Sequence, residues 1–150
     1  MTKPPVPDHP KPVLPAGMPM IRTIAMPADT NPAGDIFGGW LMAQMDLAAG
    51  NAAFRRARGR CVTIAVDAMA FLSPVKVGDE VSFYATLRSV GHTSMKIDVE
   101  AWRRPRDLTD PVQVTQAIFT FVAIDENGRP RPVPPEVPMP PEVPVSAEPA

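Results

Sequence analysis

The chain has 150 residues, enough for one domain with a core, and 45% hydrophobic with 21% charged residues is ordinary for a globular protein. Its 15 Lys and Arg against 16 Asp and Glu give a formal net charge of −1, so there is no overall positive field of the kind that nucleic-acid binding needs. A single cysteine, Cys61, excludes an intramolecular disulfide and a cysteine-rich zinc site and is typical of a reducing compartment.

The N-terminal residues contain no long apolar stretch, so we expect no signal peptide. No run of about 18 apolar residues predicts a membrane span. We therefore expect a cytoplasmic protein that binds neither nucleic acid nor a membrane.

Proline is the anomaly in the composition, because seven of the 21 prolines lie within the first 19 residues and nine from Pro130 onward. Proline lacks an N–H and fixes φ, so both ends are predicted to be extended tails. The predicted boundaries are an N-terminal tail at 1–19, a folded domain at 20–133 and a C-terminal tail at 134–150. The motif PPEVP occurs twice in the C-terminal tail, which either docks in an aromatic groove of another protein or is simply solvated.

Residues 20–26, MIRTIAM, have the alternating, β-branched character of a strand. The following PADTNPAGDIFGG is dense in turn formers, and side chains such as Asn31 can bond their own backbone, which predicts a tightly specified loop. Helix formers then run from 39 to 57, and Gly59 supplies the predicted stop. This is the one long helix that the sequence predicts.

Four strands are predicted after the helix. Alternation is clear in MKIDVEAW, where Met95, Ile97 and Val99 point one way and Lys96 and Asp98 the other, so one face of the sheet is solvated there. The separators SPVKVGD, GH, RPRDLTD and ENGRP are turn-rich, and the short ones imply antiparallel neighbours. The predicted strands span 61–71, 80–90, 93–102 and 112–124.

One long helix and about five antiparallel strands predict an α+β domain in which the sheet wraps the helix. A single helix cannot cover the whole of such a sheet. Some apolar sheet surface or edge should remain for a partner subunit, so self-association is expected.

A carboxylate, Asp46, stands in the middle of the predicted helix, in WLMAQMDLAAGNAAF. Its neighbours three and four positions away offer no cation to pair with it: Met42, Ala43, Ala49 and Gly50. On a buried face an unpaired charge costs on the order of several kcal/mol. Asp46 therefore either lies on a solvated stripe or has a functional or interfacial role, and the small residues after it resemble a face built for close approach of another chain.

The segment GDIFGGW places Gly38 and Gly39 at the start of the helix, where free N–H groups could hold an oxyanion. The alternative is that these glycines only ease a tight loop into the helix. Gly38 and Asp46 are eight residues apart, about 12 Å along a helix, so they cannot act on the same carbon atom from one chain. Two such helices packed antiparallel across a two-fold axis would bring Asp46 of one subunit to the Gly38 end of the other.

The chain reads, in order, MPADTNPAGDIFGGWLMAQMDLA, VTIAVDAMAFLSPVKVGDEVSFYA, VGHTSMKIDVEAW and FTFVAIDENGRPRPVP. In this order and spacing the segments resemble the hot-dog-fold acyl-CoA thioesterases, in particular the short bacterial YciA type. The resemblance covers residues 22–134 and leaves both tails unexplained. It implies hydrolysis of acyl-CoA to free CoA and a carboxylic acid by a homo-oligomer, a dimer at minimum and a trimer of dimers as in relatives. No cofactor and no metal are expected, because CoA is part of the substrate and product.

The resemblance also implies a role for each matching residue. Asp46 would be the essential acid, acting as general base toward water or as the nucleophile that forms a mixed anhydride. Asn31, from the partner chain, would orient the water or the substrate. The amide of Gly38 or Gly39 would face the thioester oxygen.

Contacts to CoA are expected at the GHTS segment, through Gly91, Thr93 and Ser94. His92 stands where relatives often have arginine, and a turn role is the alternative reading of that residue. The basic segment RRARGR, with Arg55 and Arg56, could meet the CoA phosphates. The alternative is a solvated helix end whose cations complement the helix dipole.

Three other functions fit parts of the sequence. A hot-dog dehydratase would need a histidine in the site, and the chain has only His9, in the tail, and His92, in a hairpin. A non-catalytic acyl-CoA-binding sensor would be expected to carry a DNA-binding module, and the first 19 residues are too short and proline-rich for one. In a proline-rich scaffold protein the tails would matter and the domain would only oligomerise.

Overall fold

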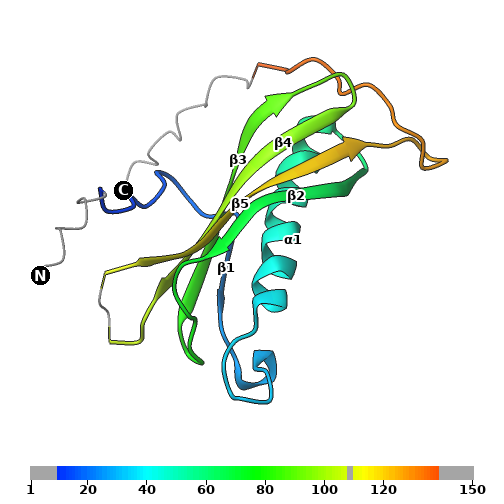
Figure 1. Ribbon diagram of the computed structural model, residues 1–150. Coiled ribbons are helices and arrows are strands. Elements are labelled where there is room, and N and C mark those ends of the chain that lie inside the picture. Colours follow the sequence, from blue (N-terminus) through cyan, green and yellow to red (C-terminus); the bar gives the residue numbers. More distant parts are fainter. Residues whose placement is uncertain (1–9, 108–109, 139–150) are drawn as a thin grey trace, which may run out of the picture.

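The computed structural model describes residues 10–107 and 110–138. One long helix lies against one face of a twisted, five-stranded antiparallel sheet (Figure 1). The predicted α+β, hot-dog fold is therefore confirmed. The elements are β1 (Ile21–Ile24), the 3-10 helix η1 (Pro27–Asp29), α1 (Gly38–Ala57), β2 (Cys61–Phe71), β3 (Glu80–Val90), β4 (Ser94–Arg104) and β5 (Val112–Ala123).

The strand order is β1-β3-β4-β5-β2, so β2 is an edge strand that pairs only with β5. Consecutive strands pair from β3 to β5, as the short separators predict, but β2 and β3 do not pair. SPVKVGD, a longer separator, links β2 to β3 without making them neighbours in the sheet. The segment crosses the sheet because it is anchored on the way: Val75 is buried in the core, and Asp79 accepts hydrogen bonds from the Lys76 N–H and from Arg103.

The core lies between α1 and the concave face of the sheet. On β4 the predicted alternation is confirmed, because Met95, Ile97 and Val99 are fully buried while Lys96 is exposed. The facing side chains of α1 are mostly small, which lets the helix approach the sheet closely. They are Leu41, Met45, Ala48, Ala49, Ala53 and Ala57.

This packing corrects the expectation that the small residues of the helix face another chain. Ala48, Ala49 and Ala53 have no exposed surface, and a Cβ at Gly50 would lie 3.5 Å from the ring of Phe121 on β5. The small face of α1 therefore belongs to this chain's own core. Three large apolar side chains of the helix are exposed instead: Met42, Leu47 and Phe54.

The end of the helix also differs from the prediction. Arg58, rather than Gly59, adopts the left-handed conformation, with φ 51° and ψ 46°. Gly59 instead allows a close approach, because a Cβ there would lie 2.8 Å from Nη2 of Arg131. That Nη2 donates to the carbonyl of Ala57 at 3.0 Å and so caps the helix.

Each predicted tail contacts the domain through a few of its described residues. Leu14 lines a small cavity with Tyr84 and Trp102 on the face of the sheet opposite α1. The carbonyls of Pro134 and Pro135 accept hydrogen bonds from Arg56 and Arg58, since proline lacks an N–H but keeps its acceptor. Residues 1–9 and the second PPEVP motif lie outside the described residues.

The alternation on β4 can be tested with two adjacent residues. Ile97→Ala removes a fully buried side chain and is expected to lower the free energy of unfolding by about 2–5 kcal/mol. Lys96→Ala, on the exposed face, should change it by no more than about 0.5 kcal/mol. Urea unfolding at one protein concentration measures both, and equal losses would contradict the assignment of the two faces.

Candidate active site

Asp46 lies in the middle of α1 and is partly exposed. Its Oδ1 accepts a hydrogen bond from the hydroxyl of Thr63 on β2 at 2.5 Å. The pairing of β2 with β5 shifts register between Thr63 and Ala65. The carboxylate is thus held by a neutral donor, with no cation paired to it among the described residues, and its second oxygen remains available to a ligand.

Exposed apolar side chains lie on α1 and β2, the two elements that carry Asp46 and Thr63. Leu47 on α1 is 61% exposed and Ile64 on β2 is 58% exposed, with Met42, Val62 and Val66 also at the surface. The outer edge of β2 has no partner strand within the described chain. An unpaired edge flanked by large apolar side chains is typical of a subunit interface, so the carboxylate stands next to a surface suited to a second chain.

Asn31 organises the loop before α1, as predicted. Its Oδ1 accepts hydrogen bonds from the N–H groups of Ala33 and Asp35 at 3.0 and 3.1 Å. Its own N–H donates to the Asp35 carbonyl at 2.7 Å. Since the side-chain oxygen is used within the loop, the Nδ2 amide is the part of Asn31 that can donate to a ligand.

Gly38 and Gly39 are the first two residues of α1. Among the described residues their N–H groups have no acceptor, whereas the Trp40 N–H already donates to the Phe37 carbonyl. A cavity of about 340 Å³ opens beside Gly38, and a Cβ at this position would lie 2.9 Å from Cζ of Phe71. The rest of its lining is largely apolar: Ile36, Leu41, Leu72, Ser73, Pro74 and Val75.

The structure confirms that Gly38 and Asp46 belong to one continuous helix. Eight residues of helix separate them by about 12 Å. One chain therefore carries a carboxylate and a pair of free amides that are too far apart to act on one carbonyl group. A site that used both groups would have to take them from two different chains.

The residues predicted to contact CoA lie at the other end of α1. Gly91 and Ser94 form the turn between β3 and β4, in which the Gly91 N–H donates to the Ser94 carbonyl, and Thr93 accepts from the Ala123 N–H. The Val133 N–H donates to the carbonyl of His92 in this turn. The next residue, Pro134, accepts from Arg56, so one short segment links the turn to the arginines of the helix end.

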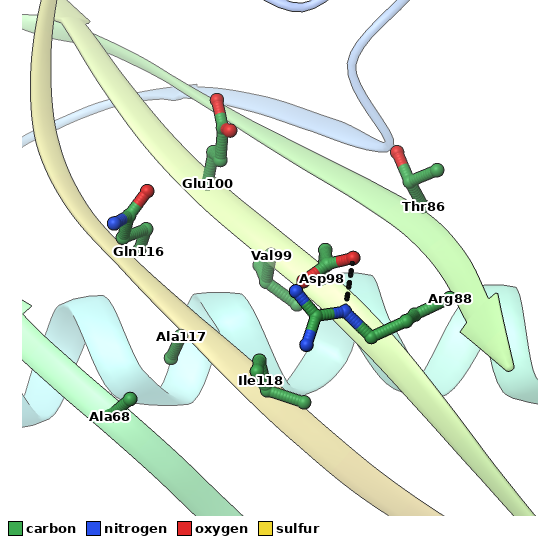
Figure 2. A pocket seen from close by; sticks show the side chains of 9 residues that line it. All are labelled: Ala68, Thr86, Arg88, Asp98, Val99, Glu100, Gln116, Ala117 and Ile118. Atoms are coloured by element: carbon green, nitrogen blue, oxygen red, sulfur yellow. Dashed lines mark hydrogen bonds and ion pairs between the residues drawn. The ribbon is translucent and has the colours of Figure 1, made fainter. Parts of the chain in front are cut away.

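A different cavity, of about 480 Å³, lies on the face of the sheet opposite α1 (Figure 2). Arg88 on β3 and Asp98 on β4 form an ion pair of 3.0 Å across it, and Glu100 and Gln116 line the same face. None of the predicted site residues lines this cavity. Arg88 and Asp98 pair with each other, and the carboxylate of Glu100 accepts a hydrogen bond from the indole N–H of Trp102. The cavity contains neither Asp46 nor the free amides at the start of the helix.

Other reactive groups fit catalysis less well. Burial raises the pKa of the Cys61 thiol, although Arg131 opposes this by its charge, so the thiolate is disfavoured at neutral pH. Within residues 10–107 and 110–138, no group of three His, Cys, Asp or Glu side chains is placed to hold a metal ion. In the same residues no helix is both long and apolar enough to cross a membrane.

Thr63 is the site residue that the sequence did not reveal. Threonine is common in strands, and nothing in VTIAVDAMAF distinguishes Thr63 from a residue chosen for β-propensity. Its role depends on which strand packs beside the carboxylate. The local pattern does not indicate that β2 packs beside α1.

Comparison with known proteins gives consistent matches. The profile of the Thioesterase superfamily matches residues 33–109. An uncharacterized acyl-CoA thioester hydrolase from Zymomonas mobilis is 56% identical over 128 residues, which cover 85% of this chain and 86% of that protein. The acyl-CoA thioester hydrolase YciA from Escherichia coli is 46% identical over 127 residues, 82% of this chain and 96% of that protein.

Solved structures agree with these matches. A hexameric thioesterase from Yersinia pestis superposes with a TM-score of 0.77 at 49% identity, covering 82% of this chain and 100% of that one. An acyl-CoA hydrolase from Staphylococcus aureus was solved as an asparagine-to-alanine variant in complex with coenzyme A. This structure superposes with a TM-score of 0.71 at 32% identity, and the match covers 76% of this chain and 68% of that one. An aspartate-to-alanine variant of the same enzyme was also solved. The asparagine and the aspartate substituted in these two variants are fifteen positions apart in that enzyme.

The two roles of the Asn31 side chain can be separated by two variants. Asn31→Ala removes the acceptor for two loop amides and is expected to speed hydrogen exchange in residues 27–37 about fivefold, as the loss of about 1 kcal/mol implies. Asn31→Asp keeps the acceptor oxygen and replaces the Nδ2 donor by a second, charged oxygen, so the bonds to the two loop amides remain and its exchange should be close to that of the parent chain. Exchange measured by mass spectrometry tests this, and equal exchange in all three proteins would contradict the bonding described.

Proposed function

The chain belongs to the thioesterase superfamily and is an acyl-CoA thioester hydrolase; from this premise we propose that Asp46 is its catalytic carboxylate, in a site shared between two chains. The observation that carries the assignment is the bond from Thr63 to Asp46, which orients an otherwise unpaired carboxylate beside an exposed apolar surface. The reaction is hydrolysis of an acyl-CoA by water. Carboxylate and water are sufficient for it, so the proposal includes no cofactor and no metal.

Two chemical routes are open to Asp46. As general base, the free oxygen would take a proton from water while the water oxygen attacks the thioester carbon, and the C–S bond then breaks to release CoA. As nucleophile, the same oxygen would bond to that carbon and displace CoA, and water would hydrolyse the resulting mixed anhydride. In both routes Thr63 holds the carboxylate in one orientation.

The remaining groups of the site come from the partner chain in this proposal. The free amides of Gly38 and Gly39 would donate to the thioester oxygen as negative charge develops on it. Asn31 would use its Nδ2 to orient the water or the substrate. Asn31 and Asp46 are fifteen positions apart, the same spacing as the two positions substituted in the Staphylococcus aureus enzyme, and this supports their pairing in one site.

The proposed assembly is a homo-oligomer built from dimers. The exposed edge of β2 and the apolar side chains beside Asp46 supply the surface that a second copy would cover. Structural neighbours of the same fold are hexameric, which supports a trimer of dimers. The single cysteine supports a reducing compartment, and the cytoplasm is the proposed location.

The CoA part of the substrate is proposed to extend from Asp46 toward the C-terminal end of α1. There the β3–β4 turn, with Gly91, Thr93 and Ser94, lies beside Arg55 and Arg56 through the bonds made by Val133 and Pro134. With CoA extending in this direction, the acyl end of the substrate would point the other way. It would enter the apolar cavity beside Gly38 of the partner chain.

Replacing the carboxylate tests the function directly. Asp46→Asn should reduce free-thiol release from a panel of acyl-CoAs by about 10²–10⁴-fold, because the amide can neither accept a proton nor attack the thioester. Asp98→Asn removes a carboxylate on the opposite face of the sheet and serves as the matched control. Equal rates for Asp46→Asn and the parent enzyme would remove Asp46 from the chemistry, and absent hydrolysis by the parent with tight CoA binding would indicate a non-catalytic acyl-CoA-binding protein.

The supporting hydroxyl gives a second, independent prediction. Thr63→Val preserves the shape of the side chain but removes the donor to Asp46, so kcat should fall about tenfold, the equivalent of about 1.4 kcal/mol, with little change in KM. Thr63→Ser keeps the hydroxyl and should recover most of the activity. Steady-state kinetics distinguish the two variants, and unaltered kcat in Thr63→Val would show that the bond has no role in orientation.

A further inference from the structure

A second built cavity lies at the C-terminal end of α1. It has a volume of about 430 Å³ and is lined on one side by Ala52, Arg55, Arg56 and Arg58. Residues 135–138 form the other side, and together with Pro134 we call them the strap. The charged residues that line it are three arginines and Glu136, so the cavity is cationic in a chain whose net charge is −1.

Capping of the helix does not explain these arginines. Arg131 already donates to the Ala57 carbonyl, and the N–H groups of Arg58 and Gly59 donate to the Phe54 carbonyl. The end of the helix therefore has its own donors. Positive side chains in the last turn would complement the dipole, but that effect does not require them to line a cavity.

The guanidinium groups are held but not neutralised. Arg56 donates to the Pro134 carbonyl at 2.5 Å and Arg58 to the Pro135 carbonyl at 3.2 Å. A carbonyl group takes one donor and leaves the positive charge in place. Nε of Arg56 is buried without a hydrogen-bond partner among the described residues. Arg58 also adopts a left-handed conformation that costs a non-glycine residue on the order of 1 kcal/mol.

We propose that this cavity is a phosphate-binding site, with the arginines as its binding side chains and the strap as the wall that holds Arg56 and Arg58 in place. Guanidinium forks bind phosphate oxygens with several charge-assisted hydrogen bonds, which the unused donors here can supply. Two sources offer the same chemistry: the nucleotide end of CoA, and a free nucleotide.

The location suits the substrate's own phosphates, an assignment that rests on the proposed function. Ten residues of helix separate Asp46 from Arg56, about 15 Å along α1. The arm of CoA from sulfur to the first phosphorus contains about 13 bonds, the length of about four extended residues or about 14 Å. A thioester at Asp46 would therefore bring the phosphates to the strap.

The test uses the full-length chain and inorganic pyrophosphate, with binding measured by calorimetry. Arg58→Met is expected to weaken pyrophosphate binding about tenfold, as the loss of one charge-assisted contact implies. Arg58→Lys keeps the positive charge but loses the planar guanidinium, so its affinity for pyrophosphate should lie between those of the parent chain and Arg58→Met. Glu136→Gln removes the carboxylate of the strap and should tighten binding. Arg129→Met, an exposed arginine that does not line the cavity, is the control with the same loss of charge, and thermal unfolding confirms that each variant is folded.

The ratio of kcat/KM for an acyl-CoA to that for the matching acyl-pantetheine identifies the source of the phosphate. A lower ratio in Arg58→Met assigns the site to the nucleotide end of the substrate. An unchanged ratio with weakened pyrophosphate and ADP binding assigns it to a separate nucleotide. Absence of pyrophosphate binding by the parent chain, or equal binding by Arg58→Met and Arg129→Met, would overturn the proposal. Failure of the proposed function would appear differently, as normal hydrolysis by Asp46→Asn.

Discussion

The close contact between α1 and the concave face of the sheet is the constraint on which the rest of the structure depends. Alanines at three core positions of the helix, Ala48, Ala49 and Ala53, are fully buried against the strands. Because the helix lies so near the sheet, a side chain at its margin reaches β2, and the hydroxyl of Thr63 can hold Asp46. The same packing leaves the large apolar side chains of α1 turned outward, away from the chain's own core.

This arrangement also explains why the chain is incomplete as an isolated subunit. Free amides lie at the start of the helix and the oriented carboxylate in its middle, and a rigid helix cannot bring them together. An unpaired edge at β2 and exposed apolar residues next to Asp46 supply a surface for another copy. Assembly and catalysis are therefore linked by geometry in the proposed mechanism. The length of the helix beyond Asp46 also determines where a long substrate such as CoA would be held.

Much of the fold could be predicted from local patterns. The alternation in MKIDVEAW and the helix formers from 39 to 57 determine elements that depend mainly on neighbours in the sequence. The prediction that failed is the direction in which the small face of the helix points, which depends on contacts between distant segments. The crossing made by SPVKVGD, anchored by Val75, likewise leaves no signal in the local pattern. In the site, Asp46 stood out as a charge without a partner in an apolar helix, and Asn31 was indicated by the family resemblance. Thr63 and the strap acquire meaning only from the packing of β2 and of residues 134–138 against α1.

The central claim, that each site takes Asp46 from one chain and Asn31 from another, is tested most directly by mixing two inactive subunits. Asp46→Asn and Asn31→Ala chains are refolded together, and acyl-CoA hydrolysis is compared with that of each variant refolded alone. In a mixed dimer one site carries both substitutions and the other carries neither, so random pairing should restore about a quarter of the parent activity. A mixture no more active than the two variants assayed separately would contradict a site shared between chains.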